Sequence, residues 1–426
     1  MPMKRGPIIV AGGVAQRVGR SGHTWVFLQY LLGLRRLGWD VLFLDRLEPE
    51  MCADENGRPC APEDSMAFAY LENSFRAAGL AGAWAILDGD GRCLGCSRRE
   101  VIEFARSAPF LLNFMGYCTD EEILAAVECR VFIDLDPGLG QMWQRLGLAD
   151  LFSGHDAFVT VGTRIGSPGC LVPTCGLPWI RTLPPVVLEE WPRVEEPGDA
   201  ITTIATWRGD SGPIEYEGRT YGLRLHSFRD LLPLPGRSDQ EFRVALDIHP
   251  LETSDLARLA EEGWIVEDPL VVAADPAAYR DFIAASRAEL MVAKTLYTDT
   301  RSGWISDRSA CYLASGRPVI ASDTGFGATI PAGEGLVPFS TVDEAAAGID
   351  RIASDWKRHA RAARELAEEW FDSDRVLDRL IDEVASAPAP ARTAESRRAR
   401  DPMVRDPMAA DPMAADPMAV DPMAVA

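Results

Sequence analysis

The chain has 426 residues, 47% of them hydrophobic, and a formal net charge of −21 at pH 7. This length predicts two to three domains with sizeable cores. The negative charge argues against nucleic acid or an anionic membrane as a main partner, because both select basic surfaces. We expect a cytoplasmic protein, because no apolar run reaches the roughly 20 residues of a membrane span and the first residues lack a signal-peptide pattern.

A strand, a glycine loop, a helix and a second strand are predicted at the start of the chain. The apolar run at residues 7–11 ends in Gly12 and Gly13, residues 25–37 carry apolar side chains at helical spacing, and residues 41–45 form a second short apolar run. This order is typical of a parallel βαβ crossover. The glycines do not follow the G-x-G-x-x-G pattern, so a dinucleotide cofactor is not predicted.

Further short apolar runs alternate with helical stretches in the first half of the chain. Strands are predicted at residues 110–114, 130–134 and 157–161. Residues 48–100 are rich in Pro, Gly, Asp and Cys, and one helix is predicted within them, over residues 64–78. The alternation predicts a parallel sheet whose functional loops lie at one edge.

Nine cysteines without a secretory signal indicate reduced thiols. Cys93 and Cys96 form a C-x-x-C motif, and together with Cys52 and Cys60 they are the candidates for a four-thiolate zinc site. Because the spacing is irregular and no second C-x-x-C is present, we favour unpaired thiols on a surface insertion. No metal ion is predicted.

The second half of the chain predicts another α/β unit. Residues 166–197 are rich in proline and are interpreted as a linker. Strands are then predicted at residues 201–206, 242–247 and 288–293, and residues 343–384 have helical patterning.

Residues 301–339 predict a helix, a strand and a glycine-rich loop in close succession. The helix begins at Ser306 or Asp307, both good N-cap residues, and ends at Gly316. The start of such a helix offers unpaired backbone N–H groups and a positive dipole end, which suit a phosphate. A short buried strand follows at residues 318–321.

Side chains around this helix start are candidates for binding a diphosphate. Thr324 and Gly325 open the loop after the strand, at the edge where open α/β sheets bind ligands. Arg301 and Arg308 flank the helix start and carry the charge to neutralise a diphosphate.

Two further cations follow predicted strands of the second unit. Arg208 comes after the first of them and Lys294 after a later one, so both are placed to meet a diphosphate. Lysine otherwise occurs only at Lys4 and Lys357, which makes Lys294 conspicuous.

Residues 301–339 resemble the donor-binding half of the GT-B glycosyltransferases, where a helix, a small-Gly-x-Pro-Val-Ile strand and a glycine loop hold the nucleotide sugar. The sequence SGRPVIASDTG at residues 315–325 matches that element, and GEGLVPF at residues 333–339 is similar to the strand after it. The N-terminal βαβ unit also resembles the start of these enzymes. Cys311 stands where retaining members usually carry a glutamate, so the sequence does not assign the stereochemistry.

The resemblance implies an α/β fold with two Rossmann-like domains facing a central cleft. Residues 1–190 would bind the acceptor and residues 191–385 the nucleotide sugar, and the last helix would cross back onto the first domain. Residues 386–426 repeat Asp-Pro-Met every five residues. The repeated proline prevents a continuous helix and nothing there can build a core, so this tail is predicted to be disordered.

The activity implied is transfer of a sugar from a nucleotide-diphosphate sugar to a hydroxyl group of a small molecule, as in antibiotic tailoring, with neither a cofactor nor a metal ion. Two alternatives stay open. One is a nucleotide-sugar epimerase on the same fold. The other is a catalytically degenerate protein that acts as a partner or scaffold, which the cysteine in the glutamate position leaves open.

The resemblance also implies a catalytic histidine near His23, because inverting natural-product enzymes place a base at this point. Asp134, Asp136 and Asp120 follow strands or lie in loops of the same domain and are candidates to fix its tautomer. The alternatives are that His23 caps a helix starting at Thr24, and that the aspartates form turns and caps.

Overall fold

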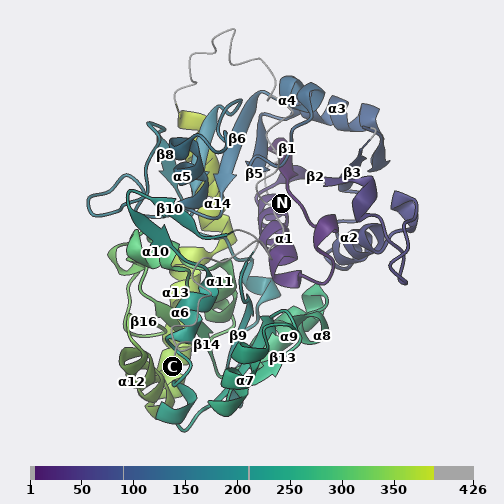
Figure 1. Ribbon diagram of the computed structural model, residues 1–426. Helices are drawn as coiled ribbons and strands as arrows, with labels where there is room; N and C mark the ends of the chain where they lie inside the picture. Colours follow the sequence, from purple (N-terminus) through teal and green to yellow (C-terminus); the bar gives the residue numbers. More distant parts are fainter. Residues whose placement is uncertain (1–4, 90, 210–211, 388–426) are drawn as a thin grey trace.

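The computed structural model describes residues 5–89, 91–209 and 212–387. Two sheets lie one above the other in Figure 1, each covered by helices. We call each sheet with its helices a unit, and the eight-stranded sheet of the first unit has the order β4-β3-β2-β1-β5-β6-β7-β8. Its strands are β1 (Gly6–Ala11), β2 (Trp39–Leu47), β3 (Trp84–Asp88), β4 (Cys93–Gly95), β5 (Phe110–Phe114), β6 (Cys129–Asp134), β7 (Ala157–Thr160) and β8 (Trp179–Arg181).

The six-stranded sheet of the second unit has the order β13-β12-β9-β14-β15-β16. Its strands are β9 (Ala200–Thr206), β12 (Glu241–Asp247), β13 (Ile265–Glu267), β14 (Ala288–Met291), β15 (Val319–Ser322) and β16 (Leu336–Phe339). A separate antiparallel hairpin joins β10 (Ile214–Tyr216) to β11 (Arg219–Tyr221). The strands of the six-stranded sheet all pair in parallel, so their carboxyl ends share one edge.

Helices connect the strands and cover the sheets. Those of the first unit are α1 (Ser21–Arg36), α2 (Met66–Ala77), α3 (Arg98–Ser107), α4 (Glu121–Ala126) and α5 (Leu139–Leu146). Those that follow are α6 (Arg224–Arg229), α7 (Thr253–Glu261), α8 (Pro269–Val272), α9 (Pro276–Ala285), α10 (Thr295–Asp299), α11 (Asp307–Ala314), α12 (Val342–Ser354), α13 (Trp356–Leu366) and α14 (Ser373–Ser386).

The predicted strands of the first unit are present, because each is an apolar run long enough to be buried on both faces. Three strands of this eight-stranded sheet were not predicted. β3 and β4 lie within residues 48–100, so the cysteine-containing segment extends the sheet and is not a surface insertion. β8 lies within the proline-rich stretch interpreted as a linker. Helix α1 begins at Ser21, earlier than predicted, because the polar residues before its apolar face also adopt helical geometry.

The last helix crosses back onto the first unit, as predicted. In Figure 1, α14 runs into the upper half of the molecule beside α1. A Cβ atom added at Gly33 of α1 would lie only 2.6 Å from a methyl carbon of Leu377, so this close packing requires glycine. The chain passes between the units twice, near Val186 and near Phe371, and these two passages are hydrogen-bonded to each other. The Val186 N–H donates to Phe371 O (2.7 Å), and the Ser373 N–H donates to Val186 O (2.8 Å).

The first sheet ends at Arg181 and the second begins at Ala200. The predicted domain boundary at residue 190 lies between them and stays a prediction. The repeat tail, residues 388–426, lies outside the described residues. None of the helices in the described part of the chain combines the length and the apolar character that a membrane crossing needs.

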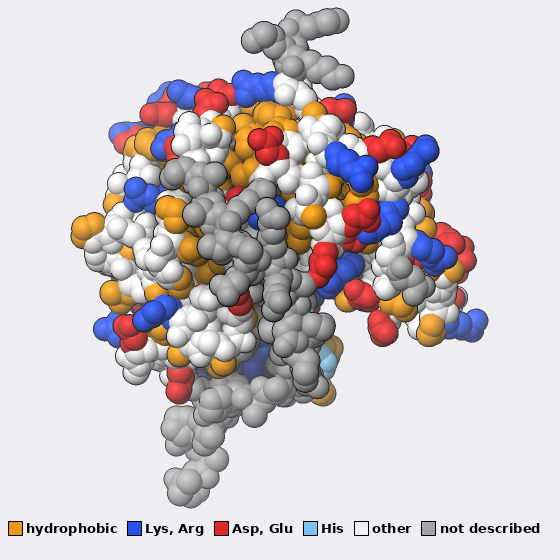
Figure 2. Space-filling model, turned by 90° about the horizontal axis from the view of Figure 1, so that it is seen from above, with side chains coloured by type: hydrophobic (Ala, Val, Ile, Leu, Met, Phe, Trp, Pro, Cys, Tyr) orange, Lys and Arg blue, Asp and Glu red, His pale blue; other side chains and the backbone are white. Residues whose placement is uncertain are grey.

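Charged side chains of both signs are interspersed on the face seen in Figure 2. The surface of the described residues also carries exposed ion pairs, such as Arg36 with Asp374 (2.9 Å) and Arg5 with Asp378 (2.7 Å). This face therefore does not single out a polyanionic partner.

Candidate functional site

The carboxyl edges of the two sheets meet at a cross-unit ion pair. Asp136 follows β6 of the first sheet, and Lys294 follows β14 of the second. The Lys294 Nζ lies 3.0 Å from the Asp136 Oδ2, and the Tyr297 hydroxyl donates to the other carboxylate oxygen at 2.5 Å. The Lys294 side chain is only 12% exposed. A buried ammonium at this edge therefore already binds an anionic oxygen.

A second contact between the units is made by the loop after β7. The Thr163 hydroxyl donates to Gly303 O (2.9 Å), and the Arg164 N–H donates to Ser302 O (3.0 Å). Gly303 has a φ of 75°, and a Cβ atom there would lie 2.4 Å from the Thr163 hydroxyl oxygen. Only glycine fits this approach, so the loop that precedes α11 is fixed against the first unit.

The start of α11 has the predicted capping geometry. Ser306 is the N-cap residue, and its side chain accepts a hydrogen bond from the Arg308 N–H at 3.3 Å. The Arg308 guanidinium donates to the Glu289 carboxylate at 2.5 Å and to Ile204 O at 2.6 Å. Glu289 is fully buried and is the second residue of β14, so this pair lies beneath the start of α11, against β9 and β14. Arg308 is thus a helix-start cation that also neutralises a buried carboxylate.

Arg224, on α6, is a cation of this site that the sequence analysis missed. Its guanidinium donates to the backbone oxygen (2.8 Å) and the hydroxyl (3.0 Å) of Thr206, the last residue of β9. The positive charge of Arg224 lowers the pKa of the Asp307 carboxyl group, whereas burial raises this pKa by a larger amount. We refer to Arg224, Lys294 and Arg308 as the cation cluster. Arg224 follows an unpredicted hairpin and has no motif, so no sequence signal marked it.

The other predicted donor-binding arginines lie at the margin of this cluster. Arg301 is half-exposed, has a positive φ of 50°, and lies 3.5 Å from the Asp323 carboxylate. Arg208 forms a partly buried ion pair with Glu252. Both pair with a carboxylate, as Lys294 and Arg308 also do.

The predicted loop residues after β15 are placed at the sheet edge as expected. The Thr324 hydroxyl is buried and donates to Trp304 O at 2.5 Å, which ties the loop to the segment before α11. Gly325 has a φ of 89°, and its N–H donates to the Asp323 side chain at 2.8 Å. These two residues fix the shape of the loop.

His23 lies in the first turn of α1, so it does not precede the helix as the sequence suggested. Its Nε2 lies 2.7 Å from Gly13 O. Because a carbonyl can only accept, Nε2 carries the proton and Nδ1 is the basic nitrogen. Gly12 leaves no room for a side chain, since a Cβ atom there would lie 2.1 Å from the Phe27 ring. The glycine loop and His23 therefore form one hydrogen-bonded element.

The candidate partners of His23 are engaged elsewhere. Asp120 caps α4 and forms an ion pair with Arg98 at 2.9 Å. Asp136 binds Lys294. Asp134 is buried and accepts from the Gln141 amide and the Thr160 hydroxyl, both at 2.7 Å. These contacts assign Asp134 to the support of the loop after β6.

Burial raises the pKa of Asp134 to about 6, and the hydrogen bonds from Thr160 and Gln141 offset only part of this rise. A carboxyl group whose pKa is higher in the folded state stabilises the fold when protonated and loses that contribution as pH rises. Compared with Asp134→Asn, the wild-type protein is therefore expected to lose about 1.4 kcal/mol of unfolding free energy per pH unit between about pH 4 and pH 6. Urea unfolding at several pH values measures this difference. The matched control is Asp281→Asn, an exposed residue of α9. A difference that does not change with pH would contradict the prediction.

A second buried carboxylate, Asp45, was also missed. It accepts from the N–H groups of Val14 and Ala15, both at 2.7 Å, and from the Tyr117 hydroxyl at 2.9 Å. It therefore anchors the glycine loop to β2. An aspartate at the end of an apolar strand is the signal that marked Asp134, and it applies equally to Asp45.

The four cysteines considered as zinc ligands do not form a cluster. In the described segments, no group of three or more His, Cys, Asp or Glu side chains is arranged to share a metal ion. Cys52 is buried, and Cys60, Cys93 and Cys96 are half-buried thiols without disulfide bonds.

No protein-family model and no curated protein matches this sequence. Solved structures do match. The fold is that of the GT-B glycosyltransferases, which confirms the predicted fold class. AviGT4, a glycosyltransferase involved in avilamycin A biosynthesis, is similar over 89% of this chain and 97% of its own, with 12% identity and a TM-score of 0.51.

Two further structures extend the likeness. HepE from Anabaena, in complex with UDP-glucose, covers 89% of this chain and 100% of its own, with 11% identity and a TM-score of 0.51. An alpha-glucosyltransferase in complex with UDP and DNA covers the same shares, with 10% identity and a TM-score of 0.54. These identities are low, so the likeness is one of fold.

Proposed function

We propose that this protein transfers a sugar from a nucleotide-diphosphate sugar to a hydroxyl group of a small-molecule acceptor, without a metal ion. The observation that carries the proposal is the cation cluster at the carboxyl edge of the second sheet. Arg224 and Lys294 lie at that edge beside the start of α11, where Arg308 is bound to the buried Glu289, and Lys294 already binds an anionic oxygen, the Asp136 carboxylate. A phosphate oxygen is the ligand of a nucleotide sugar that can take that place.

The cluster supplies what the chemistry of this transfer requires. When the bond between the anomeric carbon and the diphosphate breaks, negative charge develops on the leaving oxygen. Fixed cations and helix-start N–H groups stabilise that charge without reorganising. In our proposal His23, through its basic Nδ1, accepts the proton of the acceptor hydroxyl from the side of the first unit.

The likeness to known structures supports the donor class. HepE binds UDP-glucose in its crystal structure, and AviGT4 acts in the biosynthesis of an antibiotic. We therefore expect a nucleotide sugar as donor and a small natural product as acceptor, with the reaction in the cytoplasm.

Calorimetric titration with UDP, TDP, GDP and their sugars tests the proposal. We expect one nucleotide to bind with a dissociation constant on the order of 1 μM, about −8.2 kcal/mol. Turnover of the nucleotide sugar without an acceptor would instead indicate an epimerase. If no nucleotide binds, the proposal fails, and a scaffold role on the same fold becomes the better explanation.

A further inference from the structure

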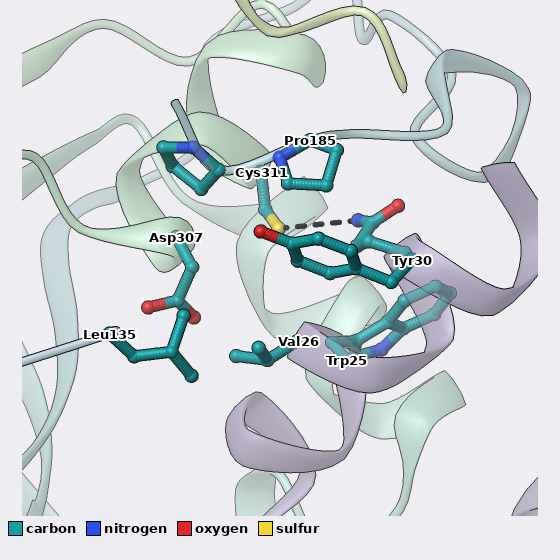
Figure 3. A pocket seen from close by; sticks show the side chains of 9 residues that line it. Trp25, Val26, Tyr30, Leu135, Pro185, Asp307 and Cys311 are labelled. Atoms are coloured by element: carbon teal, nitrogen blue, oxygen red, sulfur yellow. Dashed lines mark hydrogen bonds between the residues drawn. The ribbon is translucent and has the colours of Figure 1, made fainter. Parts of the chain in front are cut away.

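A small cavity lies between α1 and α11, where the two units meet (Figure 3). Its volume is about 20 Å³, enough for one water-sized group, since a water molecule needs roughly 10–15 Å³ on this measure. Most of its wall is apolar and comes from Trp25, Val26, Leu135 and Pro185. Four residues with polar groups also line it. The Gln29 amide and the Cys311 thiol are hydrogen-bonded to each other, which leaves the hydroxyl of Tyr30 and the carboxylate of Asp307.

The Tyr30 hydroxyl lacks a partner for its hydrogen bonds. Tyr30 is 1% exposed, and its hydroxyl makes no hydrogen bond to any described residue. In Figure 3 the ring extends from α1 past Cys311, and the hydroxyl points toward the side of the cavity where Asp307 lies. Burial and, to a smaller degree, the charge of Asp307 raise the pKa of this phenol, so it remains a hydrogen-bond donor at neutral pH. Buried hydroxyl groups are normally paired, so a group from outside the chain fits here.

Asp307 is the second unusual group of this cavity. It is the first residue of α11 and is half-buried, and within the described part of the chain its carboxylate accepts a hydrogen bond only from its own N–H. Burial raises the pKa of its carboxyl group, and the neighbouring Arg308 lowers it. A carboxylate repels the phosphates that the adjacent cation cluster attracts, so Asp307 is suited to a different part of the ligand.

We propose that this cavity recognises one hydroxyl group of the sugar that the enzyme transfers. The hydroxyl donates a hydrogen bond to the Asp307 carboxylate and accepts one from the Tyr30 hydroxyl. This inference rests on the proposed function and names the group that its donor site selects. Asp307 precedes Arg308 of the cation cluster directly, and in a nucleotide sugar the group next to the diphosphate is the sugar.

The chemistry of the two groups narrows the ligand further. A hydroxyl both donates and accepts, which matches one acceptor and one donor on the wall. A carbonyl would leave Asp307 without a donor, and an ammonium would leave the Tyr30 hydroxyl without an acceptor. The volume of about 20 Å³ excludes a larger polar group.

The test compares the affinity for the bare nucleoside diphosphate with that for its sugar derivative, by calorimetry. The measured quantity is the ratio of the two affinities. The ratio is the affinity for the nucleotide sugar divided by the affinity for the bare diphosphate. In Asp307→Asn we expect this ratio to fall at least tenfold, because a charge-assisted hydrogen bond to the sugar is lost, while the diphosphate alone binds as well or better. Tyr30→Phe should lower the ratio less. Asp281→Asn, the exposed control on α9, should leave it unchanged.

Deoxy analogues of the nucleotide sugar then identify the hydroxyl. The analogue that lacks the recognised group should bind wild type and Asp307→Asn equally well, while the other analogues keep the difference. An unchanged ratio in Asp307→Asn, with or without a lower melting temperature, would overturn the inference and leave the cavity as a site for a structural water. If no nucleotide binds the wild-type protein, the proposed function itself fails. That result differs from a failure of this inference, in which the nucleotide and its sugar bind but their affinity ratio is the same in Asp307→Asn.

Discussion

Replacing Arg308 with alanine is expected to lower the free energy of unfolding by about 3–5 kcal/mol, because it leaves the Glu289 carboxylate buried without its cation. Glu289 is fully buried, and one of its carboxylate oxygens already has no hydrogen-bond partner among the described residues. Urea unfolding, followed by circular dichroism, measures the loss. Because Arg308 is also a candidate for binding a diphosphate, the same replacement is expected to weaken nucleotide binding.

Two controls separate this effect from a general loss of charge. Arg358→Ala breaks an exposed ion pair with Glu334 and should leave the free energy of unfolding nearly unchanged. The double replacement of Arg308 and Glu289 by leucine should recover much of the stability, because hydrophobic residues of similar volume often substitute for a buried pair. If Arg308→Ala is as stable as Arg358→Ala, the pair is not buried in solution.

Replacing Lys294 with alanine is expected to weaken nucleoside diphosphate binding by roughly 10-fold to 100-fold, since a charge-assisted hydrogen bond contributes about 1.5–3 kcal/mol. Asp136→Asn should act in the opposite direction. The Asp136 carboxylate lies 3.0 Å from the Lys294 Nζ and competes with a phosphate for it. Calorimetry on both variants with the same nucleotide measures the two shifts.

Lys357 provides the matched control for Lys294, because it is an exposed lysine on α13. Lys357→Ala should bind the nucleotide like the wild-type protein. Equal affinity of Lys294→Ala and wild type would remove Lys294 from the donor site. Weaker binding by Asp136→Asn would show that this carboxylate supports the site and does not compete for it.

The parts of the fold that the sequence predicted well are those fixed by local signals. The helix at Asp307–Ala314 has an N-cap serine before it and Gly316, with a φ of 70°, after it, and the strand Val319–Ser322 is a short apolar run. Each signal lies within a few residues of the element it defines, so no tertiary information was needed.

The parts that the sequence did not predict depend on contacts between distant residues. β4 is a three-residue strand that exists only because it pairs with β3. Arg224 is the first residue of α6, which follows the β10–β11 hairpin, and nothing near it in the sequence marks it. The burial of Glu289 beside Arg308 follows from the packing of β14 against α11, which a strand pattern does not reveal.

Cys311 shows how a departure from a family pattern needs the structure to be interpreted. The sequence marked it only as a missing glutamate. In the structure it is buried, and its Sγ accepts a hydrogen bond from the Gln29 amide of α1 at 3.7 Å. The position is therefore packed against the first unit, which an ionised side chain would not tolerate without a partner.

The pairing of the two connections has a consequence for motion between the units. The second unit is inserted into the first, since the chain enters it near Val186 and returns near Phe371, and these two passages are hydrogen-bonded to each other. Any movement of one unit against the other would therefore turn about this one place, and it would have to break the contacts that Thr163 and Lys294 make across the sheet edges. Pro184 and Pro185 stiffen one of the two passages. Distance labels placed beside Val186 would thus report little of such a swing, whereas labels near Asp136 and Lys294 would report all of it.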